Sequence, residues 1–234
     1  MKPRDELATS SEQQKDLDRL LSEARMGSYQ TAAAGAPGAA LSSLDVYVYN
    51  MRLAGALLGP LHLLEVVIRN AMHEQLTRHL GRPDWWESDA VTFEDWQDRS
   101  LEKAELDVDR VCRNGGRDPV PGDTVAALEF GFWVGLLGPG FERDLWRPAL
   151  QQAFPNNRRG RDGLYKMLSR LRRLRNRVGH HEPVHDRVNL RQYEDIINAI
   201  KFVSVPVSVW VDDRSLVPVV LQQAPGTGLK VQHF

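Results

Sequence analysis

The sequence contains very little cysteine. Cys112 is the single cysteine among 234 residues, so the chain can form neither an internal disulfide nor a cysteine-rich zinc site. This usage is typical of proteins in a reducing compartment, and Cys112 is interpreted as a residue that packs between helices. The sequence therefore excludes a small fold held together by covalent or metal cross-links.

Long apolar segments are also missing. The opening stretch MKPRDELATSSEQQKDLDRL lacks the apolar region of a signal peptide, and no uninterrupted apolar run is long enough to span a bilayer. We therefore expect a cytoplasmic protein that makes no membrane contact.

The chain has almost no net charge. Lys and Arg number 30 and Asp and Glu 31, which gives a formal net charge of −1. A general nucleic-acid coat would be strongly basic, so any RNA contact must be local, and the run from Arg158 to Arg177 is the expected place. The sequence also lacks a glycine-rich phosphate loop, paired zinc ligands and a serine nucleophile elbow, so we expect no cofactor and no metal.

Helical periodicity of apolar residues runs through most of the chain and predicts an all-α fold. We expect an N-terminal helix ending near Gly27 with a flexible linker (1–40), a helical domain (41–212) and a loop-like tail (213–234). The expected helices of the domain are 45–80, interrupted at Gly59-Pro60, then 93–112, 123–137, 141–154, 162–181 and a helix from 189. The stretch VSVPVSVWV could be helix or strand, and a kinked helix is favoured because no other strand is predicted.

The segment Asp162–Pro183 combines an apolar stripe with a polar face rich in arginine. On a helical wheel Asn176 and His180, four residues apart, share one face. Arg175 lies near the edge of the apolar stripe, where a buried, unpaired guanidinium would cost several kcal/mol. We expect Glu65, a carboxylate inside an apolar helix, to be its partner.

These residue types suit attack of a ribose 2′-hydroxyl on its own phosphate without a metal. An imidazole exchanges protons near neutral pH, a guanidinium holds the phosphate oxygens, and an amide orients either group. Arg175 to His180 fits the Arg-x(4–6)-His signature of HEPN-domain ribonucleases. The longer stretch Leu174 to Pro183, LRNRVGHHEP, resembles the closing motif of the Abi-like (abortive infection) branch.

Two softer elements add to the resemblance. Glu65 to Asn70 resembles the Glu-x-x-x-Arg-Asn element of that branch, and Glu129 to Trp133 resembles its Phe-Gly-Phe-Trp stretch, with glutamate in place of a small polar residue. The resemblance implies a HEPN-type helical bundle and an endoribonuclease toxin of antiviral defense. It also implies a hydrolase that leaves a 2′,3′-cyclic phosphate and a homodimer whose two motifs form one cleft.

Several assignments follow for individual residues. Arg175, Asn176 and His180 are the expected catalytic residues, with Glu65 and His181 in supporting roles. His181→Ala is expected only to weaken cleavage. The expected RNA-binding arginines are Arg158, Arg159, Arg161, Arg172, Arg173 and Arg177. A neutralising RNA or protein partner is possible.

Three alternatives remain open. The motif could be a solvated basic helix end, because the helix dipole favours positive charge near a C-terminus. Arg69 could serve in an intrahelical salt bridge rather than in catalysis. The whole domain could be a HEPN module that binds RNA or protein without catalysis.

Overall fold

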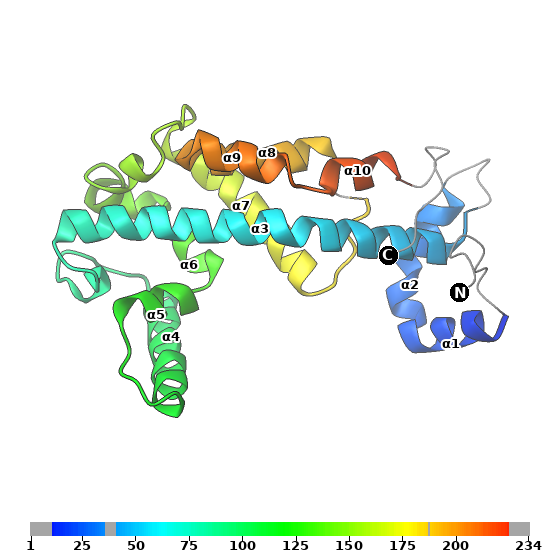
Figure 1. The fold of residues 1–234 in the computed structure, drawn as a ribbon, viewed down its shortest axis with the longest axis horizontal. Helices are drawn as coiled ribbons and strands as arrows, with labels where there is room; N and C mark the ends of the chain where they lie inside the picture. The colour runs from blue at the N-terminus through cyan, green and yellow to red at the C-terminus, as the bar shows by residue number, and fades with distance from the viewer. Residues whose placement is uncertain (1–10, 36–40, 187, 225–234) are drawn as a thin grey trace. The chain divides into compact units, whose positions relative to one another are not determined.

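A computed structural model describes residues 11–35, 41–186 and 188–224. Within these ranges the protein is all-α and contains no strand, which confirms the predicted fold class and the helical interpretation of VSVPVSVWV (Figure 1). The α-helices are α1 (Ser11–Leu21), α2 (Glu23–Ala34), α3 (Ser43–Leu80), α4 (Asp95–Asn114), α5 (Pro121–Ala127), α6 (Phe130–Gly135), α7 (Gly160–Gly179), α8 (Leu190–Val203), α9 (Val205–Asp212) and α10 (Val217–Gln222).

The chain divides into two compact units. The first unit contains the chain up to Gly59, together with Arg177–Tyr193 and the residues from Ser215 onward. The second unit contains Pro60–Asn176 and Glu194–Arg214. Helices α3, α7 and α8 each contribute residues to both units, and the predicted segments 1–40, 41–212 and 213–234 stay a prediction.

The N-terminal helix of the first unit is longer than expected. It breaks at Ser22, whose φ is 64°, and resumes as α2, which continues through Gly27 to Ala34. The stretch 31–40, TAAAGAPGAA, belongs to the expected linker, but its first four residues are helical, because alanine is the best helix former and the first glycine comes only at Gly35. Positions 36–40 of this stretch lie outside the described residues. Met26 and Tyr29 of α2 are buried against Leu44 and Val46.

Helix α3 begins with a capping box. The Ser42 hydroxyl accepts from the backbone N–H of Asp45, and the Asp45 carboxylate accepts from that of Ser42. The helix then continues through Gly59-Pro60 without the interruption that was expected there. It ends at Leu80, and the next residue, Gly81, has a φ of 72°, which suits glycine. By length and hydropathy alone α3 could span a bilayer, but helices in the core of soluble proteins meet the same criteria.

The core of the second unit joins α3 to an aromatic cluster. Leu64, Ile68, Met72 and Leu76 of α3 are fully buried. Trp85 lies in the short 3₁₀ turn η2 (Trp85–Glu87) and is also fully buried. Its ring lies near those of Phe93, Phe132 and Trp133.

Three predicted elements differ in the structure. The expected helix 123–137 is split into α5 and α6, because Leu128 and Glu129 adopt extended backbone conformations. The expected helix 141–154 is replaced by the 3₁₀ turns η3 (Pro139–Phe141) and η5 (Leu150–Ala153) and the π-helical turn η4 (Glu142–Trp146). Pro148 lacks the N–H that a continuous helix would need there. The tail is not entirely loop, since α10 occupies part of it.

Candidate active site at the end of helix α7

Helix α7 positions the motif by its apolar stripe. Leu164, Met167, Leu168, Leu171, Leu174 and Val178 are all buried. The helix begins at Gly160 and ends at Gly179, so the expectation that both histidines are helical is wrong. Asn176 precedes the end of the helix, and His180 is the first residue after it.

The helix ends in a Schellman motif. The N–H of His181 donates to the carbonyl of Val178 at 3.2 Å, and the N–H of Glu182 donates to that of Arg177 at 2.9 Å. His181 itself has a φ of 57°, the left-handed conformation that this motif needs and that glycine or asparagine usually supplies. The two histidines therefore do not lie on one helical wheel, and the helical face that Asn176 and His180 were expected to share does not extend to His180.

His181→Gly is expected to stabilise the protein by about 1 kcal/mol. A left-handed conformation costs a non-glycine residue about 1–2 kcal/mol, and the greater flexibility of glycine in the unfolded chain returns part of that gain. Urea unfolding followed by circular dichroism measures the change. His180→Gly is the matched control and should destabilise, because the φ of His180 is not positive. Destabilisation by both substitutions would contradict this account of the turn.

The predicted contact between Arg175 and Glu65 is present. The Nε atom of Arg175 donates to Oε2 of Glu65 at 3.1 Å, and both residues belong to the second unit. The Glu65 side chain is 13% exposed and that of Arg175 is 44% exposed. No bond from Nη1 or Nη2 of Arg175 to another residue is found in the described part of the chain.

The Glu65–Arg175 contact does not compensate for a buried guanidinium, as was expected. Arg175 is too exposed for an unpaired guanidinium to cost several kcal/mol, and an exposed ion pair stabilises a fold by about 1 kcal/mol at most. The geometry instead indicates that Glu65 orients Arg175, because the largely buried Glu65 carboxylate holds one edge of the Arg175 guanidinium plane. The terminal nitrogens donate to no other described residue, so their donors are free for a further acceptor.

The other two catalytic candidates are exposed. Asn176 belongs to the second unit, and its side chain is open to solvent. His180 belongs to the first unit and is also exposed. Along the chain the three residues Arg175, Asn176 and His180 fall within six consecutive positions.

Two residues that hold the turn after α7 were missed by the sequence interpretation. Arg25 of α2 donates from Nη2 to the carbonyl oxygen of His181 at 2.6 Å. The side-chain oxygen of Asn50, a residue only 4% exposed, accepts from the N–H groups of Val184 at 2.7 Å and His185 at 3.1 Å. An asparagine among the apolar residues of a predicted core helix was the signal that could have identified Asn50.

The predicted RNA-binding arginines fall into two groups. Arg158, Arg159 and Arg173 are exposed. Arg161 is only 12% exposed and donates to Glu142 and to the carbonyl of Leu137.

Arg172 and Arg177 are partly buried. Arg172 lies against α6, because a Cβ on Gly131 would be 3.5 Å from its Nη1. Arg177 pairs with Glu182 at 3.6 Å and donates to the carbonyl of Pro183 at 3.3 Å. Arg172 and Arg177, like Arg161, therefore have structural contacts that were not predicted from the sequence.

Arg69 and His73, which follow Glu65 at intervals of four, face other partners. Arg69 donates from Nη1 to the carbonyl of Ala126 at 3.1 Å, so it caps the last turn of α5, and no salt bridge to Glu65 is found among the described residues. Nδ1 of His73 accepts from the indole of Trp85 at 3.1 Å. Burial lowers the pKa of His73, which keeps the imidazole neutral and able to accept that bond.

Comparison with known proteins identifies no family and no function for the chain. No protein-family profile, curated protein sequence or solved structure matches the chain. Within the described residues, no group of three or more His, Cys, Asp or Glu side chains is arranged to hold a metal ion.

Proposed function

We propose that this protein is an endoribonuclease that cleaves RNA without a metal and leaves a 2′,3′-cyclic phosphate. The observation that carries the proposal is the contact between Glu65 and Arg175. A largely buried carboxylate orients an exposed guanidinium whose terminal donors are free, and this arrangement suits a phosphate group. The Arg-Asn-x-x-x-His sequence, with its resemblance to Abi-like HEPN proteins, supplies the remaining groups.

Each group has a defined task in the proposed reaction. Arg175 binds the non-bridging oxygens of the phosphate and stabilises the charge that grows on them. His180 exchanges a proton with the ribose 2′-hydroxyl or with the leaving 5′-oxygen, and Asn176 orients the reacting groups. The 2′-oxygen forms a bond to phosphorus while the bond from phosphorus to the 5′-oxygen breaks, so the cyclic phosphate and a 5′-hydroxyl are the products.

The proposal includes two copies of the chain. A single Arg, Asn and His set offers few groups to bind, deprotonate and protonate a phosphodiester, so a homodimer with a composite cleft is proposed. The exposed Arg158, Arg159 and Arg173 are the proposed contacts to more distant phosphates. The proposed setting is a cytoplasmic toxin of an abortive-infection system, with a possible neutralising RNA or protein.

Incubation with a labelled RNA tests the proposal. The purified protein should cut RNA equally well with and without EDTA and should leave DNA intact, because DNA lacks the attacking 2′-hydroxyl. Mass spectrometry of the fragments should find cyclic phosphate ends, and sedimentation of the same sample should find a dimer. RNA binding without cutting would instead indicate a non-catalytic module, and loss of cutting in EDTA would contradict a reaction that needs no metal.

A further inference from the structure

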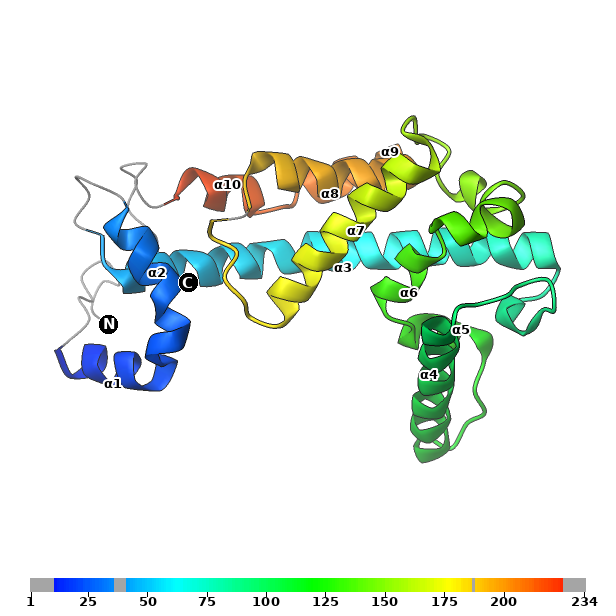
Figure 2. The same ribbon diagram turned by 180° about the vertical axis from the view of Figure 1, so that it is seen from behind.

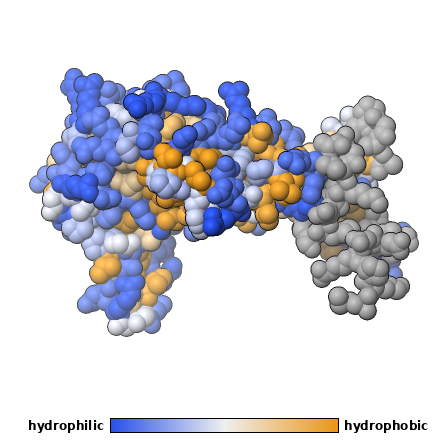
Figure 3. All heavy atoms as spheres, turned by 45° about the horizontal axis from the view of Figure 1, so that its top comes forward, coloured by the Kyte–Doolittle hydropathy of each residue, from blue (hydrophilic) through white to orange (hydrophobic). Residues whose placement is uncertain are grey.

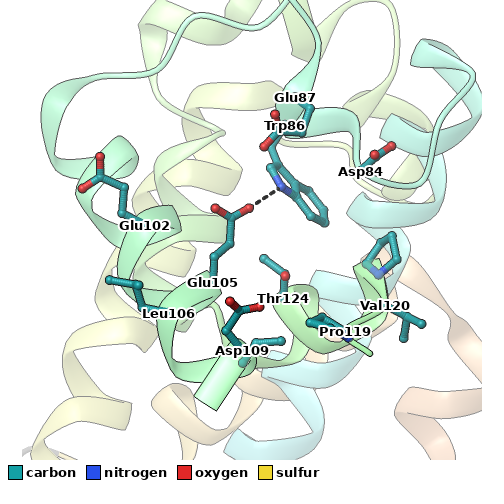
Figure 4. A pocket seen from close by; sticks show the side chains of 12 residues that line it. Asp84, Trp86, Glu87, Glu102, Glu105, Leu106, Asp109, Pro119, Val120 and Thr124 are labelled. Atoms are coloured by element: carbon teal, nitrogen blue, oxygen red, sulfur yellow. Dashed lines mark hydrogen bonds between the residues drawn. The ribbon is translucent and has the colours of Figure 1, made fainter. Parts of the chain in front are cut away.

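A groove of about 620 Å³ lies in the second unit, between α4, the turn η2 and the loop that precedes α5 (Figure 4). It follows α4 from Glu102 to Asp109, a distance of about 10 Å at 1.5 Å per residue. Figures 1 and 2 both show α4 and α5 side by side, extending away from the other helices of this unit.

Part of the groove is apolar and open to solvent. Leu106 is 72% exposed and Val120 is 55% exposed, although both are large apolar side chains. Trp86 also lines the groove, and its indole donates to Oε1 of Glu105 at 3.0 Å, which holds the ring in place. Figure 3 shows apolar patches on this part of the surface, separated by hydrophilic areas. Exposed apolar residues gathered in a cavity are typical of binding surfaces.

The charged residues of the groove are all acidic. No lysine, arginine or histidine lines it, and its carboxylates are Asp84, Glu87, Glu102, Glu105 and Asp109. Asp84 pairs with Arg82, and Asp109 pairs with Arg113. Glu87 and Glu102 have no ion-pair partner among the residues that the structure describes. The groove therefore repels phosphate and favours a cation.

The loop that precedes α5 and forms one wall of the groove is held by hydrogen bonds within the protein. Arg117 donates two hydrogen bonds to the Asp123 carboxylate, at 2.6 and 2.7 Å. Oδ2 of Asp123 also accepts from the N–H of Val120 at 2.9 Å, which holds the loop at the start of α5. These bonds keep the pKa of Asp123 far below its usual range, so the wall keeps its charge and its shape at ordinary pH.

We infer that this groove binds a helical segment of a partner protein. Basic and apolar side chains would recur along this segment at intervals of three or four residues, so that both kinds face the groove. The apolar side chains of the partner would cover Leu106, Val120 and Trp86, and its lysine or arginine side chains would pair with Glu87 and Glu102. Charge complementarity selects this occupant over RNA. The inference is independent of the proposed ribonuclease activity.

A synthetic helical peptide of lysine and leucine, titrated into the full-length protein by calorimetry, tests the inference. Glu87→Gln/Glu102→Gln should weaken binding about tenfold, since each exposed ion pair is worth somewhat less than 1 kcal/mol. The matched control is Asp98→Asn/Asp144→Asn, which removes two exposed charges of the second unit outside the groove and should change nothing.

Further arms separate groove binding from simple charge attraction. A lysine–serine peptide of equal charge should bind at least tenfold more weakly than the lysine–leucine peptide, and Leu106→Ser should remove most of that difference. Equal loss in the two double variants, equal binding of the two peptides, or displacement of the peptide by single-stranded RNA would each overturn the inference.

Discussion

His180→Ala is expected to lower the rate of RNA cleavage by a factor of about 10²–10⁴, the usual contribution of a general acid or base. The reason is that the proposed reaction needs one group that exchanges a proton near neutral pH, and the exposed imidazole after α7 supplies it. Single-turnover cleavage of a labelled RNA measures the effect. RNA binding should fall much less, because phosphate binding is assigned to arginines.

His181→Gly is the matched control for this experiment. It removes an imidazole from the neighbouring position but keeps the left-handed backbone that ends the helix. Cleavage should persist with at most a modest loss. His181→Ala is a less clean control, because alanine in a left-handed conformation destabilises the turn. If His180→Ala cleaves at the wild-type rate, His180 has no part in the reaction. The motif would then be interpreted as a solvated basic helix end.

Arg175→Lys should lower the rate of RNA cleavage as much as His180→Ala. An ammonium keeps the charge but cannot make the planar two-point contact with phosphate while one further donor binds Glu65. Arg143→Lys is the control, since Arg143 is an exposed arginine of the second unit that has no part in the proposed site. Wild-type cleavage by Arg175→Lys would contradict the role given to the Glu65–Arg175 pair.

The largest effect on stability is expected from Asn50→Leu, which should destabilise the protein by about 2–5 kcal/mol. The substitution leaves the buried N–H group of Val184 and the partly buried N–H group of His185 without an acceptor, and a fully buried unpaired group costs about 1–3 kcal/mol. Chemical denaturation followed by far-ultraviolet circular dichroism measures the loss.

Two comparisons isolate the cause. Asn50→Asp keeps an acceptor for both N–H groups and should cost less than Asn50→Leu. Asn70→Leu changes an exposed asparagine of the same helix and should alter stability by about 0.5 kcal/mol or less. Equal effects at the two asparagines would show that the buried hydrogen bonds of Asn50 contribute nothing specific.

The sequence predicted those features that depend on periodicity. The apolar stripe of α7 and the all-α class follow from spacing alone, and the Glu65–Arg175 contact was predicted, although from an incorrect estimate of burial. The splitting of 123–137 was not predictable in the same way, because Leu128 and Glu129 are extended for tertiary reasons and carry no local signal such as proline or glycine.

The end of α7 was missed for a related reason. A histidine in the left-handed conformation is uncommon, so no local signal ends the helix before His180 rather than at Pro183. The contacts that hold this turn come from Arg25 and Asn50, which lie far away in sequence. Periodicity within one segment contains no information on such partners.

The distribution of tryptophan has a consequence for spectroscopy. All six tryptophans, which include Trp85, Trp86 and Trp133 of the aromatic cluster, belong to the second unit. Tryptophan fluorescence, excited selectively so that tyrosine does not contribute, therefore reports on that unit alone, whereas the ellipticity of the backbone reports on both. Coinciding midpoints from the two signals would show that the protein melts as one cooperative body, and separate midpoints would show that no single melting temperature describes it.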